Sequence, residues 1–225
     1  MSVDAAIAPE QWPALADRYL HLLLERERPR ATQLIHDLID QGADIRDIYL
    51  EIFQASQREI GQLWQTNQVT VAQEHYCTAA TQQIISQLYP HIFAASPGER
   101  KMVMACASAE LHELGARIVA DFFELEAWNT YYLGANVPAD SILSEVRATG
   151  AHVLGLSVSL PDKVPLVAEI IEGMRQADLE HSLAILVGGR PFNLDSELWQ
   201  KVGADGYAPD ARQAIAVADG QVPAG

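Results

Sequence analysis

The sequence predicts an α+β protein of two domains, an N-terminal four-helix bundle and a C-terminal domain built on a parallel sheet. Three observations support this fold class. Apolar residues recur at intervals of three and four up to about residue 93. Beyond residue 101, short apolar runs alternate with amphipathic segments. Between the two patterns lies a stretch with the turn-forming run Ser96-Pro97-Gly98. We therefore expect domains at residues 1–93 and 101–225, joined by a linker at 94–100.

Helical spacing accounts for the first domain. The apolar positions that carry it are Leu15, Tyr19, Leu22, Leu23, Leu34, Leu38, Ile39, Ile45, Ile48, Tyr49, Ile52 and Phe53. Gly42 separates the second helix from the third, and Asn67 separates the third from the fourth. Thr70 and Gln73 have the spacing of a capping box, so we expect the fourth helix to start there and to run to about Leu88.

The second domain repeats a strand and a helix five times. We expect strands at 102–107, 127–132, 153–158, 183–187 and 205–207, and helices that begin near Glu113, Ala139, Val164, Asp195 and Ala211. This order predicts an α/β, flavodoxin-like (Rossmann-type) domain with a five-stranded parallel sheet. In such open sheets a ligand binds beyond the carboxyl ends of the strands, where the strand order reverses.

Composition argues against several classes of function. The formal net charge of −15 and the pI near 4.7 argue against a nucleic-acid-binding surface, which needs clustered lysine and arginine. Cys77 and Cys106 form no C-x-x-C pair, so we expect neither a disulfide framework nor a structural zinc site. The N-terminus lacks the pattern of a signal peptide, and no apolar stretch approaches membrane-spanning length. We therefore expect a cytoplasmic protein that contacts neither nucleic acid nor membrane.

The run from Glu110 to Gly115 follows the first strand and places one imidazole where a flat metal cofactor can dock. In an extended segment, Glu110 and His112 face the same way, so the carboxylate can accept a hydrogen bond from one ring nitrogen and leave the other for a metal. Gly115 opens the next helix without a side chain, which lets a bulky group pass close to the backbone. His112 is therefore our candidate metal ligand.

Other unusual residues end the later strands. Ser157 and Ser159 put two hydroxyls at the end of an otherwise apolar strand, although such serines also satisfy local backbone groups. Gly188 and Gly189 end the fourth strand and indicate a tight turn or close approach of a ligand. Tyr207 ends the fifth. The sequence has neither G-x-G-x-x-G nor a phosphate-binding loop, and the second histidine of H-E-x-x-H is missing.

The segment from 101 to about 218 resembles cobalamin-binding domains. The run from Glu110 to Gly115 is similar to their Asp-x-His-x-x-Gly motif, with Glu110 in place of the aspartate. The resemblance implies that His112 binds cobalt in place of the vitamin's own benzimidazole. Ser157-Val-Ser159-Leu160 and the pair Gly188-Gly189 resemble the Ser-x-Leu and Gly-Gly pattern that holds the detached benzimidazole tail, with Tyr207 at the same edge.

The helical domain resembles the adenosylcobalamin-dependent, CarH-like photoreceptor family through Trp64, nine residues, and then Glu74-His75. Without the resemblance, Trp64 is a core anchor and Glu74 a partner of the helix dipole. The resemblance implies that Trp64, Val71, Glu74 and His75 line a pocket over the upper face of the corrin. We expect no MerR-type DNA-binding segment before the bundle. Gln65 stands where some of these proteins have a second cobalt-binding histidine.

The leading expectation is a stand-alone light sensor without catalytic residues. It would bind adenosylcobalamin, change conformation or self-association when light breaks the cobalt–carbon bond, and signal through a protein partner. One alternative is a corrinoid carrier that presents methylcobalamin to methyltransferases, which makes it a subunit of an enzyme system. Another is a haem-binding sensor, since haem also accepts an axial histidine.

Overall fold

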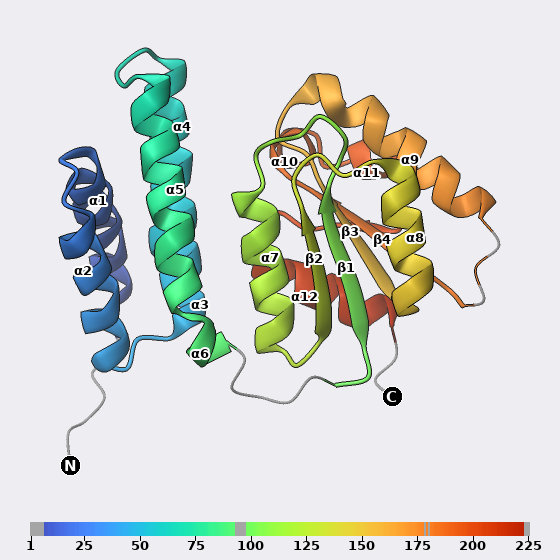
Figure 1. Ribbon diagram of the computed structural model, residues 1–225, viewed down its shortest axis with the longest axis horizontal. Coiled ribbons are helices and arrows are strands. Elements are labelled where there is room, and N and C mark those ends of the chain that lie inside the picture. Colours follow the sequence, from blue (N-terminus) through green and yellow to red (C-terminus); the bar gives the residue numbers. More distant parts are fainter. Residues whose placement is uncertain (1–6, 93–97, 178, 180, 223–225) are drawn as a thin grey trace. The chain divides into compact units, whose positions relative to one another are not determined.

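The computed structural model describes residues 7–92, 98–177, 179 and 181–222. The chain divides into two compact units, Met1–His91 and Ile92–Gly225, and Figure 1 shows the elements of each. The helices of the first unit and the parallel five-stranded sheet of the second confirm the predicted fold class. The end of the bundle at Phe93 and residues 94–97 of the expected linker lie outside the described residues. Within the described residues, no helix is both long and apolar enough to cross a bilayer.

The helical unit contains four long helical stretches. They are α1 Trp12–Leu24 after the short turn η1 Pro9–Gln11, α2 Arg28–Asp40, a composite helix of α3 Ile45–Asp47, η2 Ile48–Gln54 and α4 Ala55–Gln65, and α5 Val71–Gln87, followed by the single turn α6 Tyr89–Ile92. The segment η2 is a π-helix inside the third stretch. Its Phe53 ring packs edge-on against Tyr19 and Tyr49, with centroids 5.6 and 5.3 Å away.

The predicted capping box at the start of α5 is present. The Thr70 hydroxyl accepts a hydrogen bond from the Gln73 backbone N–H at 3.2 Å, and the Gln73 side chain accepts one from the Thr70 N–H at 2.9 Å. These bonds satisfy two backbone donors that the helix leaves open at its first turn. The start of α5 is therefore fixed next to the loop that follows Trp64.

The sheet unit has the strand order β2-β1-β3-β4-β5, and all neighbouring strands are parallel. The strands are β1 Lys101–Cys106, β2 Asn129–Gly134, β3 Val153–Ser157, β4 Ala184–Gly188 and β5 Gly206–Tyr207. The chain adds β2 on one side of β1 and β3 on the other. The strand order therefore reverses between β1 and β3, which is where open α/β sheets bind ligands.

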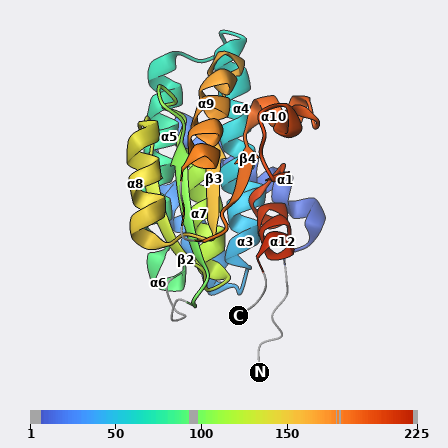
Figure 2. The same ribbon diagram turned by 90° about the vertical axis from the view of Figure 1, so that its right-hand side faces the viewer.

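Helices cover both faces of this sheet, as Figures 1 and 2 show. They are α7 Leu114–Leu125, α8 Ala139–Thr149, α9 Val164–Gln176 after the turn η3 Pro161–Lys163, α10 Arg190–Leu194, α11 Leu198–Lys201 and α12 Ala211–Gln221. Along β1, Val103 and Ala105 face the core with α8 and α9, whereas Met102, Met104 and Cys106 face α7 and α12. This alternation is the period of two that a strand buried on both faces imposes on its side chains.

Three expected boundaries were wrong. The helix expected near Asp195 is two short helices, α10 and α11, and Asp195 lies between them in an extended conformation. The second strand begins at Asn129, because Ala127 adopts a left-handed conformation with φ 59° that completes the turn after α7. Asp205 precedes β5, and its carboxylate accepts a hydrogen bond from the Ile185 backbone N–H at 2.6 Å.

Candidate functional site

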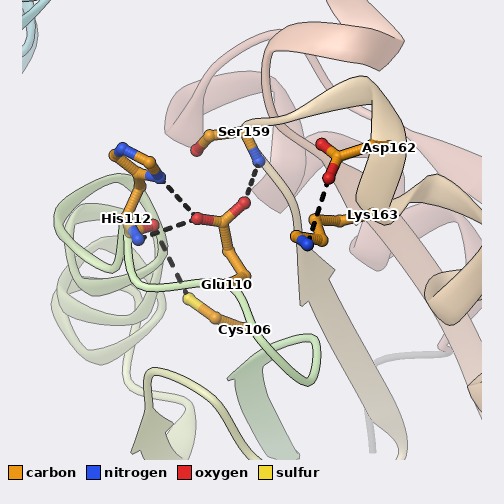
Figure 3. A network of polar contacts seen from close by, with 6 residues as sticks. All are labelled: Cys106, Glu110, His112, Ser159, Asp162 and Lys163. Carbon is orange, nitrogen blue, oxygen red and sulfur yellow. Dashed lines mark hydrogen bonds and ion pairs between the residues drawn. The ribbon is translucent and has the colours of Figure 1, made fainter.

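Glu110 lies in the loop between β1 and α7, and its side chain is fully buried. Its Oε1 accepts hydrogen bonds from His112 Nδ1 at 2.6 Å and from the His112 backbone N–H at 2.8 Å. Its Oε2 accepts one from the Ser159 backbone N–H at 2.7 Å, as Figure 3 shows. One carboxylate thus joins the loop that follows β1 to the end of β3, at the point where the strand order reverses.

These bonds fix the charge of Glu110 and the proton of His112. Burial alone would raise the Glu110 pKa, but the hydrogen bonds from the His112 ring and from the Ser159 and His112 backbones outweigh it and lower the pKa from 4.5 to about 2. A carboxylate that is ionised at neutral pH only accepts, so His112 Nδ1 carries a proton, and in the neutral ring the lone pair is on Nε2. The ring is half exposed, as a metal ligand at the edge of a sheet must be.

The depressed pKa makes the stability of the sheet unit depend on pH. The Glu110 pKa falls on folding, so the carboxylate stabilises the fold by roughly 3 kcal/mol above pH 4.5 and loses this contribution as the pH falls towards 2. Urea unfolding of the wild type and of Glu110→Gln, measured at intervals from pH 7 to pH 2, checks this. We expect the difference in free energy of unfolding to shrink across that window, and a constant difference would contradict the assignment.

The same loop is braced against the loop that follows β2. The Asn136 side chain accepts a hydrogen bond from the Ala109 N–H at 2.8 Å, and the Asn136 N–H donates to the Glu110 carbonyl at 2.9 Å. Ala109 and Asn136 both adopt left-handed conformations, with φ 62° and 53°. Sequence reasoning missed Asn136, although asparagine shortly after Gly134 is a usual residue for such a turn. It also selected Ser159 for its hydroxyl, whereas the observed contact to Glu110 is through the backbone.

Two further groups support the loop, the buried Cys106 thiol and the partly buried Glu113 carboxylate. The Cys106 thiol lies 3.8 Å from the His112 carbonyl, and burial next to Glu110 and Glu113 raises its pKa to about 12, so it stays protonated at neutral pH. The Glu113 carboxylate accepts hydrogen bonds from the Ala135 N–H at 3.1 Å and the Tyr132 hydroxyl at 3.3 Å. The loop is thus held at both ends of the Glu110–Glu113 run before any ligand binds.

Gly115 leaves space beside the site that the described residues do not occupy. It is the second residue of α7, and a Cβ added to it would meet no atom within 4 Å. Its φ lies outside the left-handed range, so neither packing nor backbone conformation of the chain requires glycine. A glycine in a helix otherwise lowers stability. The open space three residues after His112 fits a flat metal cofactor.

This reasoning predicts effects of opposite sign for Gly115→Ala. The free energy of unfolding of the ligand-free protein should rise by about 0.5 kcal/mol, because alanine restricts the unfolded chain and favours the helix. Affinity for cobalamin should fall, because the methyl group occupies the space of the ligand. Thermal unfolding and a cobalamin titration check both effects. Unchanged affinity would remove Gly115 from the site.

The predicted residues at the ends of β3, β4 and β5 lie at the same carboxyl edge. Ser157 is 8 % exposed and its hydroxyl has no hydrogen-bond partner among the described residues, whereas Leu160 is 39 % exposed. Gly188 pairs with Ser157 in the sheet register. The chain itself requires glycine at 189, because φ is 107° and an added Cβ would lie 1.9 Å from the Val158 carbonyl oxygen.

Tyr207 ends β5, and its hydroxyl donates to the Asn193 side chain at 3.0 Å. At Gly188, unlike at Gly189, an added Cβ would make an ordinary contact, 3.5 Å from the Ala208 carbonyl oxygen. The described residues therefore explain neither the Ser157 hydroxyl, which they do not hydrogen-bond, nor the glycine at 188, where an alanine would fit. Both fit a polar ligand tail between β3 and β4.

The remaining four predicted residues belong to the helical unit. Trp64 lies one residue before the end of α4 and is 42 % exposed, and Val71 begins α5 and is 48 % exposed, so neither is a core anchor of this unit. The Glu74 carboxylate accepts hydrogen bonds from His75 Nδ1 at 2.6 Å and from the Thr78 hydroxyl at 3.1 Å. Their role over a corrin stays a prediction.

Two models of a B12 binding domain match the chain, one over residues 100–216 and the other over residues 15–89. A corrinoid protein of Desulfitobacterium hafniense is 23 % identical over 211 residues, which cover 92 % of this chain and 96 % of that protein. Dimethylamine corrinoid protein 1 of Methanosarcina acetivorans is 25 % identical over 118 residues, which cover 52 % of this chain and 54 % of that protein.

Among solved structures, the monomethylamine corrinoid protein of Methanosarcina barkeri aligns with a TM-score of 0.79 at 17 % identity, over 91 % of this chain and 97 % of that one. This likeness shows the shared fold. The relatives correct the expectation of a light sensor, which was wrong: they are corrinoid proteins, and two of the three are named for methylamines. The motif of Trp64 and Glu74-His75 therefore does not identify this chain as a light sensor.

Proposed function

Because the chain belongs to the B12-binding domain family, we propose that it is a corrinoid carrier that holds the cofactor while partner methyltransferases deliver and remove a methyl group. The observation that carries the proposal is the buried Glu110 carboxylate that orients the half-exposed His112 ring at the switch point of the sheet. The corrinoid-protein relatives support methyl transfer as the class of reaction. On this proposal the chain is the carrier and its partners are the enzymes.

Each residue of the edge has a role in holding the cofactor. His112 Nε2 would bind cobalt from below, and Glu110 keeps the proton on Nδ1 and so fixes the orientation and raises the basicity of the ring. Ser157 and Gly188 would receive the detached nucleotide tail. A bound corrinoid would supply a metal that accepts and releases methyl groups, and the chain would supply an oriented imidazole ligand.

The identity of the cofactor follows from the same proposal. Family membership favours a corrinoid over haem. Methyl transfer requires methylcobalamin in one state of the cycle, whereas an adenosyl group has no part in it, so we propose the methyl form. The upper-face role of Trp64, Val71, Glu74 and His75 is a separate proposal that does not enter this argument.

The test is transfer of a labelled methyl group. The full chain is loaded with methylcobalamin carrying the label, freed of unbound cofactor by gel filtration, and mixed with a thiol acceptor and a corrinoid-dependent methyltransferase. We expect the label to stay with the protein until the methyltransferase is added and then to move to the thiol. A label that never leaves the protein with any methyltransferase of this class, or that leaves at the same rate without one, would contradict the carrier proposal.

A further inference from the structure

Arg190 is a cation at the ligand edge that the proposed function does not yet use. It directly follows Gly188 and Gly189 at the carboxyl end of β4 and is the first residue of α10, which Figure 1 shows at the same edge as the loop after β1. Its side chain is exposed. Among the described residues it makes no hydrogen bond or ion pair through that side chain, in a chain with twice as many acidic as basic residues.

Two other cations near this edge have acidic partners. Lys163, just after β3, lies 3.0 Å from Asp162, and the two are drawn in Figure 3. Arg117, in the first turns of α7, donates to the buried Asp121 at 3.2 Å. Unlike Lys163 and Arg117, Arg190 has no acidic partner among the residues that the structure describes, so its charge is available to a ligand.

The position of Arg190 relates it to one part of the candidate site. Ser157 and Gly188 are paired in the β3–β4 register, and Ser157, which is 8 % exposed, makes no side-chain hydrogen bond with the described residues. An added Cβ at Gly188 would make only an ordinary contact, 3.5 Å from the Ala208 carbonyl oxygen, so the chain's packing does not require glycine there. A serine hydroxyl that no described residue bonds, a glycine that the packing does not require and an unpaired arginine therefore lie at the carboxyl ends of these two neighbouring strands, and together they suit an anionic, polar tail.

We propose that Arg190 binds the phosphodiester of the nucleotide tail and so makes the chain select complete corrinoids over those that lack the nucleotide. This inference rests on the proposed function, because it requires the tail to lie between β3 and β4. A guanidinium presents two parallel N–H donors that match two phosphate oxygens. The phosphodiester is the anionic group of the tail, so the interaction distinguishes corrinoids with and without it.

The experiment compares two probes with the full-length protein. Aquocobalamin carries the nucleotide, and aquocobinamide has the same corrin without it. The ligand-free wild type, Arg190→Gln and Arg190→Lys are each titrated with both probes and followed by visible absorbance. At low salt, we expect Arg190→Gln to lower the affinity for aquocobalamin about tenfold and to change the affinity for aquocobinamide by less than about twofold. In high salt the effect on aquocobalamin should disappear, because salt screens the charge of the arginine. Arg190→Lys should retain most of the affinity, because it keeps the charge.

Arg147 provides the matched control. It is an exposed arginine in the last turn of α8, without an ion pair among the described residues, and that turn precedes the start of β3 at the opposite edge of the sheet. Arg147→Gln removes the same charge and should change neither affinity. Equal losses for both probes in Arg190→Gln, no loss for aquocobalamin, or the same loss in Arg147→Gln would overturn the inference. A wild type that binds neither probe would instead overturn the proposed function.

Discussion

Replacing Glu110 with alanine should lower the free energy of unfolding by about 3 to 5 kcal/mol, because it removes one partner of a buried, charged hydrogen-bond network. The Ser159 and His112 backbone N–H groups would lose their acceptor. Cobalamin affinity should also fall by a factor of 10 to 100, the usual effect of removing the carboxylate behind a ligating histidine. Urea unfolding and a cobalamin titration measure the two losses.

Glu110→Asp is the informative companion variant. It keeps the charge and restores the residue that the cobalamin motif usually has, but it is one methylene shorter. We expect it to retain the bond to His112 and to weaken the bond to the Ser159 N–H, so its stability and affinity should lie between those of the wild type and of Glu110→Ala. If Glu110→Ala unfolded within about 1 kcal/mol of the wild type, the network would not stabilise the loop as we infer.

The second large effect is expected at Gly189. An alanine there places its Cβ 1.9 Å from the Val158 carbonyl oxygen, at φ 107° and ψ 176°, a region of backbone space that only glycine occupies readily. The clash is with backbone, so neither β3 nor β4 can relieve it by a rotamer change. We expect Gly189→Ala to lower the free energy of unfolding by about 4 kcal/mol.

Gly188→Ala is the control for this variant, since the two residues are adjacent and the added methyl group is the same. Its Cβ would make only an ordinary contact with the Ala208 carbonyl oxygen at 3.5 Å. The free energy of unfolding should therefore change by less than about 1 kcal/mol, and thermal or urea unfolding of both variants provides the comparison. Similar losses in the free energy of unfolding of the two variants would show that Gly188 and Gly189 do not differ in this way.

Sequence patterns predicted the elements that are buried on both faces or that depend on local interactions. The strands near 102, 153 and 183 are buried on both faces and so appear as apolar runs, and the capping box at Thr70 is a local interaction. The π-helical segment η2 was not predictable, because Ile48, Tyr49, Ile52 and Phe53 keep the same buried face in a π-helix as in an α-helix.

The candidate site was predictable only in part, and for a physical reason. The spacing of Glu110 and His112 is local, so the sequence indicates their hydrogen bond. The bond from the Ser159 N–H depends on β3 lying beside β1. Every residue except proline has a backbone N–H, so the residue type does not indicate this donor. The Trp64 and Glu74-His75 motif is shared by related domains. It therefore identified the class of cofactor but not the function.

The most direct test of the central claim is whether His112 supplies the nitrogen bound to cobalt. The protein is produced with histidine labelled by the heavy nitrogen isotope, loaded with cobalamin and reduced to the paramagnetic cobalt(II) state for electron paramagnetic resonance. We expect the nitrogen splitting of the cobalt lines to change from the pattern of the light isotope to that of the heavy one, and the heavy-isotope pattern to be absent from labelled His112→Ala. A splitting that keeps the light-isotope pattern in the labelled protein would mean that the vitamin's own benzimidazole remains bound, and would contradict the account.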